Sequence, residues 1–130
     1  MDVSINTSLD KLRPEVLFVA TPNSYRLLSE CVSQLNGRVD ISLQKFDETF
    51  YPISLNNCVI ILQGETNGLL DINIIDKEFF IKGDKKALDH LSYYFSFMAD
   101  SALNFHWHID YYEGNQDVLE TNISLVLQVV

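Results

Sequence analysis

The sequence predicts an α+β fold made of two tandem β-β-α-β-β units, about residues 1–66 and 67–130. We expect them to form one mostly antiparallel sheet of about eight strands, with both helices packed on one face. Three observations support this. Apolar residues alternate in several short segments, two longer segments have apolar residues at helical spacing, and the order of segments is the same in both halves. With 130 residues and 47% hydrophobic content, we expect a single domain, 1–130.

The first half contains four segments with strand character and one with helical character. The expected elements are strands near Val3–Ser8 and Glu15–Ala20, a helix at Pro22–Leu35, and strands at Val39–Leu43 and Cys58–Leu62. The helix has clear boundary signals. Thr21 can cap its first turn, Pro22 suits the first helical position, and Asn36-Gly37 ends it.

The second half repeats this order. The expected elements are alternation at Leu70–Ile74, a turn at Asp76-Lys77, a strand at Phe79–Lys82, a helix capped by Asp84, and strands at Phe105–Tyr112 and Asn122–Val130. Two short sequence echoes support the repeat. SLDK at Ser8–Lys11 matches IIDK at Ile74–Lys77, and IILQ at Ile60–Gln63 matches LVLQ at Leu125–Gln128.

The segment FHWHIDYY at residues 105–112 alternates strictly. Because successive side chains of a strand point to opposite faces, its two faces differ in character. We expect Phe105, Trp107, Ile109 and Tyr111 to lie in the core, and His106, His108, Asp110 and Tyr112 to share the other face. Other strands repeat the polar pattern, which predicts an open, polar and acidic sheet face. The further residues of this face are Asp40, Ser42, Gln44, Asp71, Asn73, Ser124 and Gln128.

Charge narrows the classes of partner. The chain has 18 Asp and Glu against 9 Lys and Arg, a net charge of −9, and no Lys or Arg follows Lys86. Such a field repels a phosphate backbone, so we expect no nucleic-acid binding. It suits either simple solubility or a basic protein partner.

Targeting signals are missing from the sequence. The first ten residues lack the basic start and apolar run of a secretory signal, and no window is apolar enough for a membrane helix. Cys31 and Cys58 lie inside apolar patterns and read as buried free thiols. We therefore expect a cytoplasmic protein that does not bind membranes.

The sharpest enzymatic pattern is a possible metal site. His106, His108 and Asp110 have the spacing that lets one strand present two imidazoles and a carboxylate to zinc. A further ligand is missing, because His90 lies on a helix expected to cover the opposite face. The sequence has no phosphate-binding loop and no nucleophile elbow. We expect no enzyme and no cofactor, and keep a metal-dependent enzyme or metal-binding protein as an alternative.

Two loops mix acids with aromatic residues at matching places in the two halves. They are Lys45–Pro52 and Tyr111–Glu120. Aromatic side chains supply anchoring area and carboxylates steer a basic partner, so these loops suit an interface. The expected partner-binding residues are His106, His108, Asp110, Tyr112, Glu113, Asp117, Glu120, Asp47, Glu48 and Tyr51.

The second half also resembles a known family. Three features carry this resemblance: the strand ending in Gly83-Asp84 ahead of the Ala87, Leu88 and Leu91 helix, the His106-x-His108 strand with its acidic Gly-Asn turn, and the apolar closing strand. Together they resemble bacterial polymorphic-toxin immunity proteins of the immunity protein 32 family. The similarity covers mainly residues 79–130. It implies a cytoplasmic antidote that binds a cognate toxin domain and occludes it. Toxins of such systems include nucleases, whose basic clefts an acidic protein could occupy.

The leading expectation is therefore a non-enzymatic immunity or inhibitor protein with its acidic surface facing a basic toxin cleft. A small-ligand or self-association module is a further alternative. The sequence leaves open whether the protein is a monomer or a homodimer.

Overall fold

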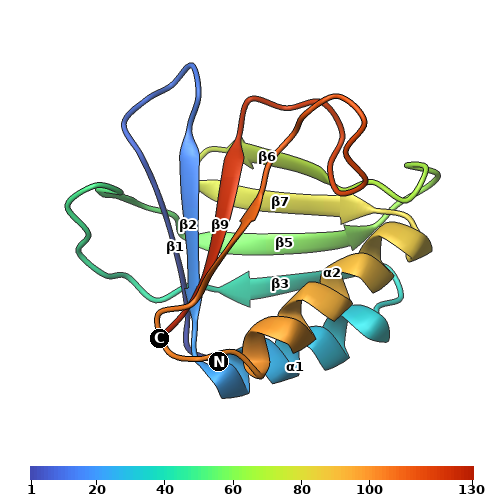
Figure 1. Cartoon of the computed structure of the whole chain (residues 1–130), viewed down its shortest axis with the longest axis horizontal. Coiled ribbons are helices and arrows are strands. Elements are labelled where there is room, and N and C mark those ends of the chain that lie inside the picture. Colours follow the sequence, from blue (N-terminus) through green and yellow to red (C-terminus); the bar gives the residue numbers. More distant parts are fainter.

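The structure is a computed structural model that covers residues 1–130. It has an α+β fold with two helices and nine strands (Figure 1). The elements, in chain order, are β1 (Val3–Thr7), β2 (Glu15–Ala20), α1 (Pro22–Ser33), β3 (Arg38–Ser42), β4 (Ile53–Ser54), β5 (Asn57–Leu62), β6 (Asp71–Ile75), β7 (Glu78–Gly83), α2 (Lys85–Ala99), β8 (His106–Ile109) and β9 (Ser124–Val129). Neither helix is long and apolar enough to cross a membrane.

The strands form two sheets, which corrects the expectation of one mostly antiparallel sheet. The five-stranded sheet has the order β4-β1-β2-β9-β8, and the four-stranded sheet has the order β3-β5-β7-β6. Each sheet contains one parallel pair, β2 with β9 and β5 with β7. Their strands cross in Figure 1, and the two helices lie side by side along one side of the molecule. Two sheets can bury a face each in a shared core, whereas one open sheet with both helices on one side would leave a whole face bare.

Local signals at the helix ends behave as predicted. The side chain of Thr21 accepts a hydrogen bond from the backbone N–H of Ser24, and Asp84 accepts one from Ala87. The Asp76-Lys77 turn is also confirmed, since both residues have positive φ and join β6 to β7. The short strand β4 was not predicted, and β8 is shorter than the predicted strand at residues 105–112.

Exchanging the two halves of the chain leaves the connectivity unchanged. Apart from the two-residue strand β4, each sheet takes two antiparallel strands from each half: β1 and β2 meet β9 and β8, while β6 and β7 meet β5 and β3. The registers agree residue by residue, because Glu15 pairs with Ser124 and Glu78 pairs with Asn57. We call residues equivalent when this exchange places them at the same position in a helix or in a sheet register.

The two helices meet at equivalent serines. The Ser29 hydroxyl donates to the Ser92 carbonyl at 2.8 Å, and the Ser92 hydroxyl donates to the Ser29 carbonyl at the same distance. These two residues are 63 positions apart, as are the caps Thr21 and Asp84. Small residues at this contact let the helices approach closely and satisfy each other's polar groups.

The core lies between both sheets and the helix pair. Phe18, Tyr25 and Phe95 are fully buried, and their rings lie 5.6 to 6.0 Å apart. The Tyr25 hydroxyl donates to the carbonyls of Phe18 and Gln128, and burial raises the pKa of Tyr25 well above its ordinary value. The tyrosine therefore ties α1 to both parallel strands of the five-stranded sheet.

The predicted polar face is divided between the two sheets. Asp40 and Asn73 lie on the outer face of the four-stranded sheet, whereas His106 and His108 lie on the outer face of the five-stranded sheet. Both outer faces also carry apolar residues. Val59 is fully buried between Asp40 and Phe80 in register, and Leu17, Val19 and Val126 form a small cluster on the other outer face. These residues occupy central strands, where neighbouring side chains cover them.

Candidate functional site

Strand β8 is the last strand of the five-stranded sheet, and its two faces differ. The side chains of His106 and His108 are exposed on the outer face, and Ile109 is fully buried on the inner face. The prediction that Trp107 and Tyr111 belong to the core is wrong: they are 38% and 39% exposed. Trp107 lies on an edge strand and is covered on one side only, while Tyr111 lies beyond the end of β8. Phe105 is partly buried against the core.

A continuous row of aromatic rings runs from α2 to β8. Tyr93 contacts Tyr94, Tyr94 contacts Trp107, Trp107 contacts Phe97, and Phe97 contacts Phe105, with ring centroids 5.5 to 6.2 Å apart. Such spacings suit tilted and edge-to-face aromatic contacts. We call this surface the aromatic face, and its residues are Tyr93, Tyr94, Phe97, Phe105 and Trp107. Tyr93 is 66% exposed and Phe97 is 40% exposed.

The loop between β8 and β9 is fastened beside the aromatic face. The Tyr94 hydroxyl donates to the carboxylate of Asp117. The backbone N–H groups of Asp117 and Val118 donate to the side-chain oxygen of Asn115, which caps this part of the loop. Burial, and then the hydrogen bond to Asp117, raise the pKa of Tyr94. Asp117, which we expected to contact a partner, thus holds its own loop in place.

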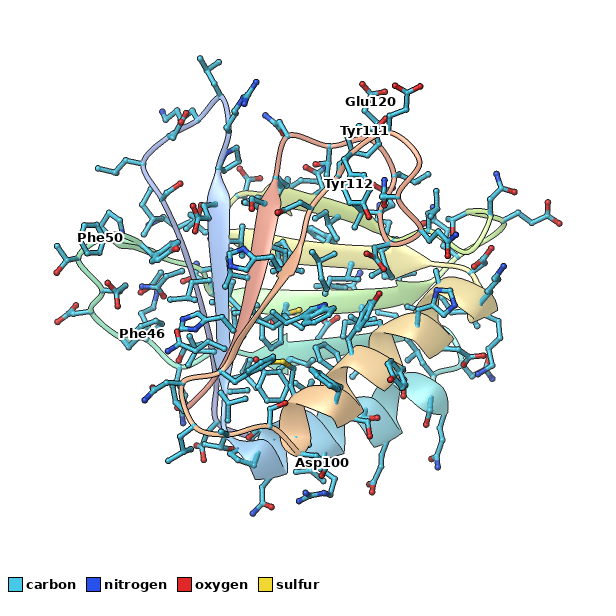
Figure 2. All side chains as sticks on the ribbon, in the orientation of Figure 1. Phe46, Phe50, Asp100, Tyr111, Tyr112 and Glu120 are labelled. Carbon is cyan, nitrogen blue, oxygen red and sulfur yellow. The ribbon has the colours of Figure 1, made fainter.

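The rest of this loop is open to solvent. Tyr112, Glu113 and Glu120 are exposed, and Figure 2 shows the side chains of Tyr112 and Glu120 on this loop. After Lys86 the chain contains six Asp and Glu and no Lys or Arg, so −6 of the net −9 falls in this last third. The aromatic face therefore has acidic side chains near it and receives no basic residue from α2 beyond Lys86, from β8, or from the following loop.

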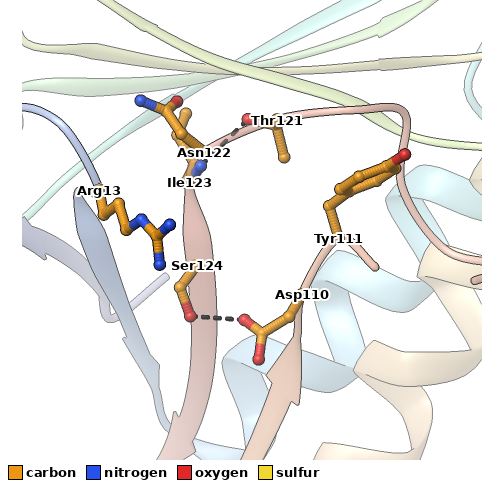
Figure 3. Close-up of a pocket in the computed structure, with 7 residues that line it drawn as sticks. All are labelled: Arg13, Asp110, Tyr111, Thr121, Asn122, Ile123 and Ser124. Atoms are coloured by element: carbon orange, nitrogen blue, oxygen red, sulfur yellow. Dashed lines mark hydrogen bonds between the residues drawn. The ribbon is translucent and has the colours of Figure 1, made fainter. Parts of the chain in front are cut away.

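Asp110 lies at the end of β8 and bonds within its own sheet. Its carboxylate accepts a hydrogen bond from the Ser124 hydroxyl of β9 (Figure 3). Both residues line a shallow hollow of about 400 Å³ together with Arg13 and Tyr111. The Asp110 carboxylate at this hollow is already engaged by Ser124.

The loop at residues 43–52 forms a different surface. The Asn6 side chain donates to the carbonyls of Phe46 and Tyr51 at 3.1 and 2.8 Å, which fixes the loop on the outer face of the five-stranded sheet. The Tyr51 hydroxyl donates to the Glu15 carboxylate, and burial with this bond raises the pKa of Tyr51 to about 12. Asp47 is exposed.

The two loops that the sequence pairs as interfaces lie apart. Figure 2 shows Phe46 and Phe50 on one side of the molecule and Tyr111, Tyr112 and Glu120 on another. Glu48 is partly buried and accepts a hydrogen bond from the Phe50 backbone at 3.2 Å, so it stabilises its own loop. The structure does not gather Asp47, Glu48 and Tyr51 with the acidic residues of the other loop.

Groups suited to metal or thiol chemistry are not assembled. No group of three or more His, Cys, Asp or Glu side chains is placed to hold a metal ion, and the set His106, His108 and Asp110 is included in this finding. Burial raises the pKa of the Cys58 thiol to about 12, which disfavours its thiolate.

The aromatic face was not predicted from the sequence, although the spacing of aromatic residues in α2 indicates it. The stripe of α2 contains Leu88, Leu91, Phe95 and Met98, and these residues are buried. Tyr93 and Phe97 are one helical turn apart and fall outside that stripe, so helical periodicity alone assigns them to an exposed side. Comparison of the chain with family models, curated proteins and solved structures found no match.

Proposed function

We propose that the protein is a cytoplasmic, non-enzymatic immunity or inhibitor protein that binds a basic toxin domain through the aromatic face and the acidic loop beside it. The observation that carries this proposal is the exposure of a continuous row of aromatic rings with acidic residues near it. Aromatic side chains dominate the binding energy of protein interfaces, and contiguous exposed patches of them mark interaction sites.

The fold itself does not require aromatic residues at these positions. The residue equivalent to Tyr93 is Glu30, the residue equivalent to Phe97 is Gln34, and the residue equivalent to Trp107 is Val39. Both helices bury the same positions in spite of this difference, since Leu28 and Val32 correspond to Leu91 and Phe95. The same architecture is thus built with polar or smaller residues in one half and with aromatic rings in the other. A binding role explains that difference.

Charge argues for a basic partner rather than a second copy of this chain. The last third contributes −6, so two copies meeting at this surface would repel each other. A basic cleft of a nuclease domain would instead be attracted, because carboxylates can take the place of substrate phosphates. The resemblance of residues 79–130 to immunity proteins gives the same class of partner.

The residues assigned to this interface come from α2, β8 and the following loop. Tyr93, Phe97 and Trp107 supply apolar area, and Tyr112, Glu113 and Glu120 form the nearby polar edge, with Asp110 further along. The imidazoles of His106 and His108 lie on the opposite face of β8 and are outside this contact. The loop with Asp47, Glu48 and Tyr51 lies on another surface and is not part of this contact.

The test uses the basic C-terminal domain of a secreted protein encoded beside this gene. The wild-type chain is expected to restore growth of cells that express that domain and to bind it in solution. Tyr93→Ala and Tyr112→Ala should weaken binding by about tenfold or more each. Phe50→Ala is the matched control, because Phe50 is 78% exposed and lies on the separate loop. Its binding should equal that of the wild type.

Two results would contradict the proposal. One is equal weakening by Phe50→Ala and Tyr93→Ala, which would show that the aromatic face has no special role. The other is an association rate that stays constant between about 50 and about 500 mM salt, because electrostatic steering must decline with screening. A neighbouring metabolic operon in place of a secreted toxin would argue for an enzyme or ligand-binding module.

A further inference from the structure

The free edge of β8 presents unpaired backbone groups. The N–H groups of Ser124 and Val130 donate to Pro14 and Ala20, so the even-numbered residues of β9 face β2. The odd-numbered ones face β8, as the bond from the Val129 N–H to the Phe105 carbonyl confirms. In an antiparallel pair the bonded residues alternate, so Trp107 and Ile109 turn their peptide groups toward β9. His106 and His108 turn theirs outward.

The other sheet edges are short, bridged at one end or charged. β4 contains only two residues, and β6 is bridged at its start by the segment around Val118, where Leu70 exchanges backbone hydrogen bonds of 2.8 Å with Asp117 and Leu119. β3 carries an exposed, two-bond ion pair between Arg38 and Asp40. Charged side chains and short strands are the usual means of protecting an edge from further pairing.

β8 lacks these protections. The residues equivalent to Arg38 and Asp40 are His106 and His108, and neither histidine forms an ion pair. β8 contains no proline, lysine or arginine, and no strand pairs with its outer side. Trp107 lies on the inner face of this edge strand, where its ring contacts Tyr94 and Phe97 of the aromatic face. An added strand would therefore gain backbone hydrogen bonds and an aromatic surface together.

We propose that the free edge of β8 accepts an extended basic segment of the partner as an additional strand. The inference rests on the proposed function, because it names the binding mode of the same surface. Alternate side chains of the segment would rest on Tyr94, Phe97 and Trp107, and its Lys and Arg would meet the acidic loop that follows β8. A second copy of this acidic chain would be repelled from the free edge of β8, so it is not the expected added strand.

The proposal can be tested with peptide ligands, so the partner need not be known. A display library of random ten-residue peptides is enriched on the wild-type protein, and the enriched peptides are resynthesised. They are expected to alternate Lys or Arg with apolar residues and to lose binding when alternate amides are N-methylated. Failure to enrich any peptide, or enrichment of acidic or helical ones, would overturn the proposal.

A pair of variants isolates the backbone contribution. His108→Pro removes the outward N–H, and proline is tolerated at that position of an edge strand. His108→Thr removes the same imidazole and keeps the N–H. The enriched peptides should bind the proline variant more than tenfold more weakly and the threonine variant as the wild type. Equal binding by both variants would overturn the proposal.

Separate control variants test whether the proline variants fold and whether the proposed function holds. His106→Pro makes the same change at the other outward amide and serves if His108→Pro does not fold, as judged by circular dichroism. If the proline variants still bind the toxin domain fully while Tyr93→Ala does not, strand addition is wrong and the proposed function stands. If Tyr93→Ala binds the domain as tightly as the wild type, the proposed function itself fails.

Discussion

Substitutions in α2 that introduce the equivalent residues of the first half test how much the aromatic face contributes to the free energy of unfolding. Three single variants give α2 the residues of α1: Tyr93→Glu, Phe97→Gln and Phe95→Val, after Glu30, Gln34 and Val32. Tyr93 is mostly exposed and has one aromatic neighbour, so its variant should lose about 0.5 kcal/mol or less of the free energy of unfolding. Phe97 is somewhat more than half buried and contacts two rings, which gives about 1 to 2 kcal/mol.

Phe95 is the reference in this series because it is fully buried against Phe18 and Tyr25. Removing its ring leaves a cavity, and the expected loss is about 2 to 4 kcal/mol. Urea unfolding followed by circular dichroism gives the midpoint and slope for each variant. The order of losses should be Phe95 over Phe97 over Tyr93. A loss at Tyr93 as large as that at Phe95 would refute the reasoning, because the aromatic face would then be part of the structural core.

Two further predictions concern polar contacts that hold the helices and loops. Thr21→Ala should cost about 1 kcal/mol in urea unfolding, and Asp84→Ala should cost more, because Asp84 also accepts the N–H groups of Thr66 and Gly68. The bonds from Ala87, and then from Gly68 and Thr66, lower the pKa of Asp84. The Asp84 contribution is present above the ordinary carboxyl pKa of about 4 and is lost as pH falls further; acid unfolding that is the same in wild type and variant would contradict it. The Tyr51 pKa is raised to about 12, so its contribution is present below about pH 10 and is lost as pH rises toward 12. Melting temperatures should fall less steeply over that range in Tyr51→Phe than in the wild type, and identical slopes would show that the hydroxyl is not engaged.

The helices and their N-terminal boundaries could be predicted from sequence because their signals are local, whereas α1 ends at Ser33, two residues before the predicted Leu35. Thr21 and Asp84 cap the helices through bonds to residues only three positions away. The Asp76-Lys77 turn is equally local. The element order of the two halves was also visible in the alternation of apolar residues.

The division into two sheets could not be predicted in the same way. It depends on the parallel pairs β2 with β9 and β5 with β7, and β2 and β9 lie about a hundred residues apart in the chain. Alternation shows that a segment is a strand but does not identify its partner. The letter match of Ile60–Gln63 with Leu125–Gln128 is also two residues out of register, since Ile60 is equivalent to Leu127.

The assignment of partner-binding residues stays a prediction. Tyr112, Glu113 and Glu120 are exposed in the loop after β8, whereas Asp117 is engaged by Tyr94. Trp107 was assigned to the core because alternation separates the two faces of a strand without showing whether either is covered. Whether a face is covered depends on the position of the strand in its sheet, and that position comes from long-range pairing.

Comparing equivalent positions of the two halves distinguishes residues that stabilise the fold from residues that are available for binding. Where both halves keep similar residues, as at Ser29 with Ser92 and Ile41 with Ile109, the residue packs or bonds inside the molecule. At the edges β3 and β8 the halves differ, since β3 carries an ion pair and β8 carries His106 and His108, which form none. The same half that leaves its edge open also carries the exposed rings and the acidic excess. Because the first half forms the same architecture without these three features, their concentration on one side argues for one binding surface and not for three separate demands of the fold.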